Sequence, residues 1–144
     1  MDLQPFARGT FRPYGYLARI TATRVKTADP LEIRDDLQVL VDVLNGSGAH
    51  PLLKAAGFHA MFENIHSFMD GNGRTGRQLL NFMLLRNGYR PVAIEYDAGR
   101  AYARGLEAWQ VDGKPDSFCS IFLDCVEQEE QTLVDLVERL RHLR

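Results

Sequence analysis

The run from His66 to Arg77 has the composition of an anion-binding loop. Gly71 and Gly73 permit positive φ and a close approach of the backbone to a ligand, so consecutive N–H groups can converge on phosphate oxygens. A helix is expected to begin near Arg74, and its N-terminus would add unpaired amides and the positive end of the helix dipole. The residues therefore predict a site for a phosphate-bearing ligand.

Three further side chains in this run carry charges suited to a nucleotide. Arg74 and Arg77 are three residues apart, share one face of the first helical turn and can both pair with phosphate. Asp70 could hold magnesium, which takes one or two protein carboxylates together with phosphate oxygens and waters. The alternatives are two solvated surface arginines and an aspartate that forms a turn before glycine.

His66 stands just before the loop, where an imidazole could face bound phosphates. Near neutral pH a histidine can accept a proton from an attacking hydroxyl group. An isolated histidine in this position would more often be structural. The neighbouring anion-binding features favour the catalytic interpretation.

The stretch Gly71–Gly76 also matches the dinucleotide-binding pattern G-x-G-x-x-G, and Glu95 lies near the position expected for a ribose-binding acid. That pattern requires a strand before the loop. Residues 65–70 instead break an apolar run with His, Ser and Asp, and helical spacing precedes them. Because no alternating β–α units come before the loop either, a Rossmann-type site is rejected.

Helices account for most of the elements that would position this loop. Apolar residues recur at three- and four-residue spacing along most of the chain, the pattern of helices with one buried face. Asp29 and Pro30 are placed to cap and open the first helix, and Glu32 to complete a capping box. The predicted helices cover residues 29–44, 51–65, 74–87, 97–110 and 130–144, with a further apolar pattern over 118–125.

Residues 9–25 differ from the rest, since aromatic and β-branched residues alternate with Gly and Pro. This composition predicts a β-hairpin. The fold class expected is therefore mostly α, a helical bundle with one small β element near the N-terminus. The final helix, 130–144, is amphipathic with mixed charges and is predicted to pack on the bundle. Pairing with a second copy or with a partner is the alternative.

The composition predicts a single domain over residues 1–144, with 45% hydrophobic and 25% charged residues. The net charge of −2 gives no basic field for nucleic acid. Cys119 and Cys125 lack metal-binding spacing and are expected to be reduced. No apolar stretch approaches membrane-spanning length, and residues 1–5 show no signal-peptide pattern, so we expect a cytoplasmic protein that binds neither membrane nor nucleic acid.

The run from His66 to Arg77 resembles the signature of the Fic family, H-x-F-x-[DE]-G-N-G-R-x-x-R, at every specified position. Gly9–Arg12 resembles the start of that family's β-hairpin flap. Further similarity at residues 50–52, 88–91 and 100–102 extends the resemblance over roughly residues 9–127. It implies a Fic-like helical bundle with a small N-terminal β-hairpin flap.

The resemblance also implies an activity, the transfer of AMP from ATP and Mg²⁺ to a Tyr, Ser or Thr hydroxyl of a target protein docked near the flap by strand addition. The implied roles are a general base at His66, a magnesium ligand at Asp70, an anion hole at Gly71, Asn72 and Gly73, neutralisation of the β- and γ-phosphates by Arg74 and Arg77, and a nucleoside contact at Asn81. The alternatives are a nucleotide-binding regulatory module without turnover and the transfer of another nucleotide or phosphate-containing group.

Two departures from the family pattern concern this chain. Ser67 stands where many members have Pro, at a position with no chemical role. The family's inhibitory motif, [ST]-x-x-x-E-[GN], has no match; before Glu63-Asn64 the required position is occupied by His59. The activity is therefore expected to be unrestrained, or to be inhibited by a separate small protein or by sequence outside this chain.

Overall fold

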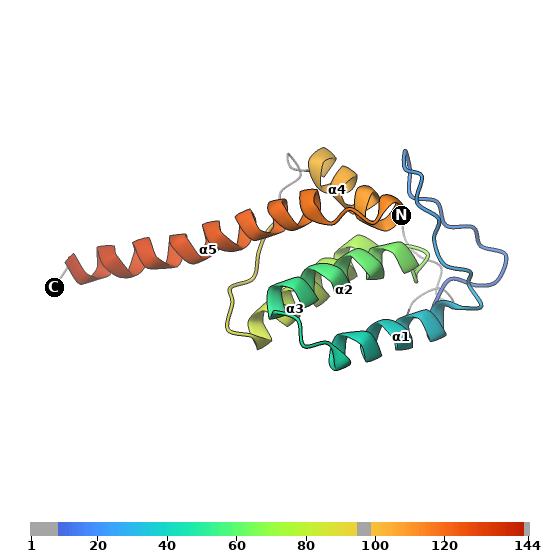
Figure 1. The fold of residues 1–144 in the computed structure, drawn as a ribbon, viewed down its shortest axis with the longest axis horizontal. Helices are drawn as coiled ribbons and strands as arrows, with labels where there is room; N and C mark the ends of the chain where they lie inside the picture. The colour runs from blue at the N-terminus through green and yellow to red at the C-terminus, as the bar shows by residue number, and fades with distance from the viewer. Residues whose placement is uncertain (1–8, 95–98, 143–144) are drawn as a thin grey trace.

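The computed structural model describes residues 9–94 and 99–142, which form a bundle of helices joined by irregular segments (Figure 1). No strand occurs in these two ranges. The helices are α1 (Ile33–Gly46), α2 (Pro51–Ile65), α3 (Asn72–Arg86), α4 (Gly99–Asp112) and α5 (Asp116–His142).

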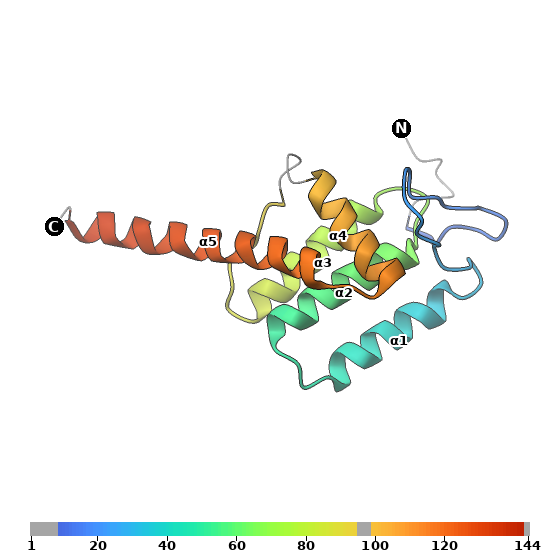
Figure 2. The same ribbon diagram turned by 45° about the horizontal axis from the view of Figure 1, so that its top comes forward.

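Helix α2 is the centre of the bundle, because it packs against all four other helices. Its sequence is apolar on most sides, as expected of a helix surrounded by others. Ala55, Ala56 and Ala60 are at most 1% exposed, and these small side chains let neighbouring helices approach closely. Figure 2 shows α1 and α3 lying along α2, with α4 and α5 crossing above it.

Helices α4 and α5 meet where Gly105 lies against the start of α5. A Cβ atom on Gly105 would stand 3.0 Å from the backbone nitrogen of Phe118 and 3.1 Å from its Cα. The fully buried Phe118 ring then packs among the aromatic rings of His59, Tyr102, Trp109 and Phe122. This aromatic cluster joins α2, α4 and α5.

The β-hairpin predicted over residues 9–25 is not found. The segment, called the flap below, contains turns closed by bonds from the Tyr16 amide to the Pro13 carbonyl and from the Thr23 amide to the Ile20 carbonyl. Most of its side chains are exposed, including Leu17 at 79%. Two strands without a third strand or a covering helix are marginally stable in water, which accounts for the missing ladder.

The first helix begins later than predicted. The Asp29 carboxylate accepts a bond from the Leu31 amide at 2.8 Å, which forms a turn, and α1 starts only at Ile33. Glu32 precedes α1 and makes no capping bond with its side chain, so the predicted capping box is absent. The predicted start of the fourth helix, Asp97, lies outside the described residues.

The predicted final helix is the second half of a longer one. Helix α5 runs for 27 residues, and Phe118, Phe122 and Val126 in its first half are buried. The prediction that residues 130–144 pack on the bundle is wrong for residues 131–142, all of which are exposed and extend away from the other helices (Figure 1). Among the described helices, none is both long and apolar enough to cross a membrane.

Candidate active site

His66 ends α2 in a left-handed backbone conformation, with φ 54° and ψ 56°. This conformation is unfavourable for residues other than glycine, and only Ala22 shares positive φ among the described non-glycine residues. The half-buried imidazole places Nδ1 3.3 Å from the Glu63 carbonyl oxygen. A proton on Nδ1 would satisfy that contact and leave Nε2 as the proton acceptor.

The surroundings of His66 keep its imidazole neutral. Burial lowers the pKa of His66, the bond to the Glu63 carbonyl acts in the opposite direction, and the charge of Arg12 lowers the pKa further. At neutral pH the ring is therefore in the form that can accept a proton. This is the state required of a general base.

Asn72 holds the loop in shape. Its side chain is 3% exposed, and its amide group forms two bonds with the backbone of Phe68, donating to the carbonyl and accepting from the N–H, both at 2.8 Å. The side chain thus closes the turn between His66 and α3. Only the backbone of Asn72 is left to contribute to the predicted anion hole.

The start of α3 has the geometry of an anion-binding helix end. Gly71 precedes the helix with φ 83°, and no side chain caps the helix here. The first amides of a helix have no partners within the helix, so at an uncapped start they can bind an anion. The predicted N–H groups of Gly71, Asn72 and Gly73 are therefore brought together at one point.

The two arginines lie over the two loop glycines. A Cβ atom on Gly71 would stand 3.4 Å from an Arg74 guanidinium nitrogen, and one on Gly73 would stand 3.1 Å from an Arg77 nitrogen. Arg74 also pairs with Asp70 at 3.1 Å, with side chains 74% and 50% exposed. The structure therefore gathers the charged groups of the loop around its exposed backbone.

A buried arginine that the sequence analysis did not assign holds the flap against the end of α2. Arg12 is 2% exposed and donates from Nε to the His66 carbonyl at 2.7 Å. Its other nitrogens donate to the carbonyls of Ile65, Tyr16 and Ala28. The last carbonyls of a helix lack partners within the helix, so Arg12 satisfies those at the end of α2.

Two further contacts attach the flap at the same point. The Arg12 amide donates to the Ser67 carbonyl at 2.9 Å, and the Phe11 ring packs on Phe68 with centroids 5.9 Å apart. The flap is thus bonded directly to the backbone that carries His66. The only signal in the sequence was the resemblance of Gly9–Arg12 to a family segment, which assigned Arg12 no role.

A second unassigned group, the Glu63 carboxyl, lies behind the loop. Glu63 is 8% exposed, and one of its oxygens would clash with a Cβ atom on Gly76. Burial raises the pKa of Glu63 to about 7, with the charge of Arg77 acting in the opposite direction. The first turns of α3 therefore rest on this carboxyl group, at a glycine where no side chain intervenes.

His59 and Tyr102 extend this buried polar cluster. The His59 Nε2 and the Tyr102 hydroxyl are 2.6 Å apart, and burial lowers the pKa of His59 to about 4. His59 and Glu63 are four residues apart and so share one face of a mostly apolar helix. The sequence offered two signals for this cluster, the four-residue spacing of His59 and Glu63 and the glycine at position 76 in the next helix.

Comparison with known proteins assigns the chain to a family. The family model described as "Fic/DOC family" matches residues 2–84, more than half of the chain. The chain belongs to the Fic/DOC family. "Protein adenylyltransferase Fic" of Drosophila willistoni is 41% identical over 101 residues, which are 65% of this chain and 20% of that protein. This chain therefore spans about a fifth of the length of that relative.

Solved structures show the same fold. Fic-1 from C. elegans is similar with a TM-score of 0.77 and 26% identity, over 94% of this chain and 39% of that one. The BepC protein of Bartonella tribocorum, solved with bound AMPPNP, has a TM-score of 0.63 and 20% identity over 75% of this chain and 54% of that one. At that identity the likeness to BepC concerns the fold alone.

Asn81 has a structural role in this Fic chain. Its side-chain amide donates to the Val92 carbonyl at 3.0 Å, and its carbonyl oxygen accepts from the Val92 amide at 2.9 Å. Both polar ends of the side chain therefore hold the segment after α3 against that helix. We leave Asn81 out of the proposed nucleotide site for this reason.

Asp70 fits a magnesium ion that is shared with a nucleotide. Its carboxylate is half exposed at the rim of the Fic loop, so it can supply one ligand while phosphate oxygens and water supply the others. Within residues 9–94 and 99–142, no group of three or more His, Cys, Asp or Glu side chains is placed to hold a metal. The arrangement suits an ion that arrives with its nucleotide.

Proposed function

We propose that this chain transfers AMP from ATP to a hydroxyl group on a target protein. The observation that carries the proposal is the position of His66, whose neutral imidazole lies where α2 ends, beside an uncapped helix start with two arginines. The naming of the relatives as protein adenylyltransferases supports this activity. BepC, which shares this fold, was solved with bound AMPPNP.

The residues suggest a division of roles. His66 accepts the proton of the target hydroxyl as that oxygen bonds to the α-phosphorus, and the bond from the α-phosphorus to pyrophosphate breaks. The amides at the start of α3, with Arg74 and Arg77, hold the phosphates and stabilise the charge that develops on pyrophosphate. Mg²⁺ held by Asp70 would supply further neutralisation of the phosphates.

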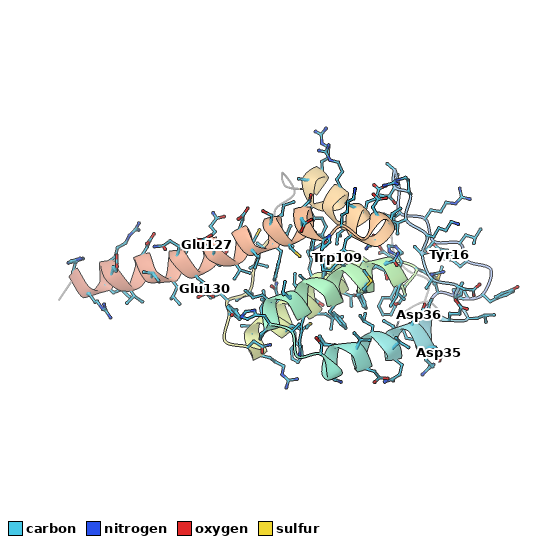
Figure 3. All side chains as sticks on the ribbon, in the orientation of Figure 1. Tyr16, Asp35, Asp36, Trp109, Glu127 and Glu130 are labelled. Atoms are coloured by element: carbon cyan, nitrogen blue, oxygen red, sulfur yellow. The ribbon has the colours of Figure 1, made fainter. Side chains whose placement is uncertain are left out.

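The flap is the proposed docking site of the target. Leu17 and Tyr14 are 79% and 78% exposed, and no ladder partner occupies the flap among the described residues. The exposed apolar side chains of the flap could contact a target segment. Because Arg12 bonds the flap to the His66 backbone, a segment docked there would lie close to the base. Figure 3 labels Tyr16, a residue of the flap, at the end of the bundle where the flap lies.

The test is incubation of the chain with Mg²⁺, cell lysate and ATP labelled on the α-phosphate. Wild-type chain should transfer label to protein, and His66 variants should not. His66→Ala alone would mix two effects, because alanine is strained in the left-handed conformation. His66→Asn is the matched control, since asparagine tolerates that backbone but is not a base.

Full transfer by both His66 variants would show that His66 is not the base. No transfer by the wild-type chain, with ATP binding measurable by calorimetry and no release of pyrophosphate, would favour the regulatory module instead. Label from the γ-phosphate but not the α-phosphate would indicate transfer of a phosphoryl group. Parallel incubations with ATP labelled on the α- or the γ-phosphate therefore separate AMP transfer from phosphoryl transfer and from binding without turnover.

A further inference from the structure

The two arginines of the loop differ in what holds their side chains. Arg74 is paired with the Asp70 carboxylate at 3.1 Å, so part of its charge is balanced before any ligand binds. Among the residues that the structure describes, no acidic side chain forms an ion pair with Arg77. A long, exposed arginine without a fixed partner has many rotamers to lose when it binds a ligand. A neutral polar group could hold Arg77 in place and leave its charge available.

The Tyr102 hydroxyl is such a group. Its oxygen lies 2.6 Å from Nε2 of His59, a residue that is fully buried. The His59 Cε1 atom, next to Nε2 in the ring, would stand 3.2 Å from a Cβ atom on Gly76, so the hydroxyl lies close to the first turns of α3. Burial and the charge of Glu63 raise the pKa of Tyr102, whereas the charge of Arg77 and a hydrogen bond with it lower that pKa. The Arg77 guanidinium therefore faces the hydroxyl.

The hydroxyl is fixed in position and remains neutral. The Tyr102 ring packs against the rings of His59 and Phe118, with centroids 6.0 Å and 5.8 Å away. Its raised pKa keeps the hydroxyl protonated near neutral pH. A hydroxyl oxygen carries two lone pairs, so it can bond His59 and still accept from an arginine N–H. Tyr102 can therefore hold Arg77 without neutralising it.

The Glu63 carboxyl also faces Arg77 but forms no ion pair with it. One of its oxygens is buried without a hydrogen-bond partner and lies against Gly76. Burial raises the pKa of Glu63 to about 7, with the charge of Arg77 acting in the opposite direction. Near neutral pH the carboxyl is therefore ionised only in part, and most of the charge of Arg77 is left for a ligand.

The other side of the Arg77 guanidinium lies over the loop. One of its nitrogens would stand 3.1 Å from a Cβ atom on Gly73, at the uncapped start of α3. A phosphate bonded to the free amides of that helix start would meet the guanidinium there.

We propose that Tyr102 is a positioning residue, which holds the Arg77 guanidinium over the start of α3 so that it meets the β- and γ-phosphates of ATP. The inference rests on the proposed function, because it takes a nucleoside triphosphate to be the ligand. It adds to that function a group on α4 that acts on the nucleotide through Arg77.

The experiment measures the dissociation constant of ATP with Mg²⁺ by calorimetry and that of AMP by NMR titration of the whole chain. Tyr102→Phe removes the hydroxyl and keeps the ring. It should weaken ATP binding about 5-fold or more, the equivalent of one hydrogen bond. AMP lacks the phosphates that Arg77 would hold, so its binding should stay unchanged. Intact AMP binding would also show that the loop of the variant is folded.

Two further variants separate positioning from a general effect on the fold. Tyr89→Phe is the matched control, since Tyr89 is a partly buried tyrosine beyond the other end of α3, and it should bind ATP like wild type. Arg77→Gln should weaken ATP binding by itself. In the Arg77→Gln background, Tyr102→Phe should cause no further loss, because a positioning residue has no effect once the residue that it holds is gone.

The possible failures distinguish this inference from the function on which it rests. ATP binding by Tyr102→Phe that matches wild type would overturn the inference. So would an equal loss of ATP and AMP binding, or a further loss in the Arg77→Gln background. In each of these cases the proposed function stands if Arg77→Gln weakens ATP binding. A wild-type chain that binds no ATP, or an Arg77→Gln variant that binds it like wild type, would overturn the proposed role of Arg77 together with this inference.

Discussion

Replacing Arg12 by methionine should destabilise the whole fold as well as the flap. The substitution keeps an apolar stem of similar length and removes bonds to four carbonyls, those of Tyr16, Ala28, Ile65 and His66. A bond from a charged donor contributes about 1.5–3 kcal/mol, partly offset by the cost of burying the charge. Taking about 1 kcal/mol for each carbonyl left without a donor, we expect the free energy of unfolding to fall by about 4 kcal/mol.

Thermal and urea unfolding followed by circular dichroism would measure this loss. For a chain of this size it corresponds to a fall in Tm of about 10 °C. Arg12→Lys keeps the charge but lacks the planar fork that reaches several carbonyls at once, so it should fall between wild type and Arg12→Met. Arg19→Met, at an exposed flap position, is the control and should change stability by less than about 0.5 kcal/mol.

The same variant has a second readout at His66. The charge of Arg12 helps to lower the pKa of His66, so its removal should raise that pKa toward the usual value. Titration of the imidazole by NMR would detect the change without any assay of activity. The reasoning would be refuted if the free energy of unfolding of Arg12→Met lay within about 1 kcal/mol of the wild-type value and the pKa of His66 did not change.

Three other predictions concern the loop and the cluster behind it. The rate of AMP transfer should fall on acidification with a midpoint below pH 6.5, because burial lowers the pKa of His66; a pH–rate profile with its acid midpoint above 7 would contradict this. Gly76→Ala should cost about 1–3 kcal/mol of stability by overpacking, and a double-mutant cycle with Glu63→Ala should recover part of that loss. The pKa of Glu63 is raised from 4.5 in the unfolded chain to about 7 in the folded one, so the unfolded chain loses this proton at lower pH and folding is disfavoured as the pH rises. Between pH 4 and pH 8 the free energy of unfolding of wild type should therefore fall by about 2–3 kcal/mol relative to that of Glu63→Gln, as measured by urea titration. Parallel curves of stability against pH for the two proteins would contradict the raised pKa.

The helices and the glycine turn before α3 were predictable because their signals are local. The apolar spacing after Pro51 placed α2 correctly, and the glycines at 71 and 73 indicated an uncapped helix start where the structure has one. Even here Asn72 was understood only in part. Its place in an anion hole stays a prediction, while its side chain bonds to Phe68, a contact that depends on how the loop closes.

Contacts between distant parts of the chain could not be predicted in this way. The Arg12 bonds join residues 53 and 54 positions apart, and no composition rule signals which arginine will be buried. The flap has the residue types of a hairpin, but strand formation depends on neighbours that it does not have within the described structure. For residues 131–142 of α5, amphipathic spacing indicated a helix correctly but gave no information on whether the bundle extends far enough to cover it.

The Arg12 bonds join residues that are far apart in the sequence, and this affects how the site can open. Surface segments that are attached by a few bonds can detach before the core unfolds. The Arg12 amide, bonded to the Ser67 carbonyl, should therefore exchange with deuterium faster than amides inside α2. A target peptide held on the flap should slow that exchange. Binding of the target and fixing of the His66 backbone would then be thermodynamically linked, so that the base is held most firmly when there is a hydroxyl group to deprotonate.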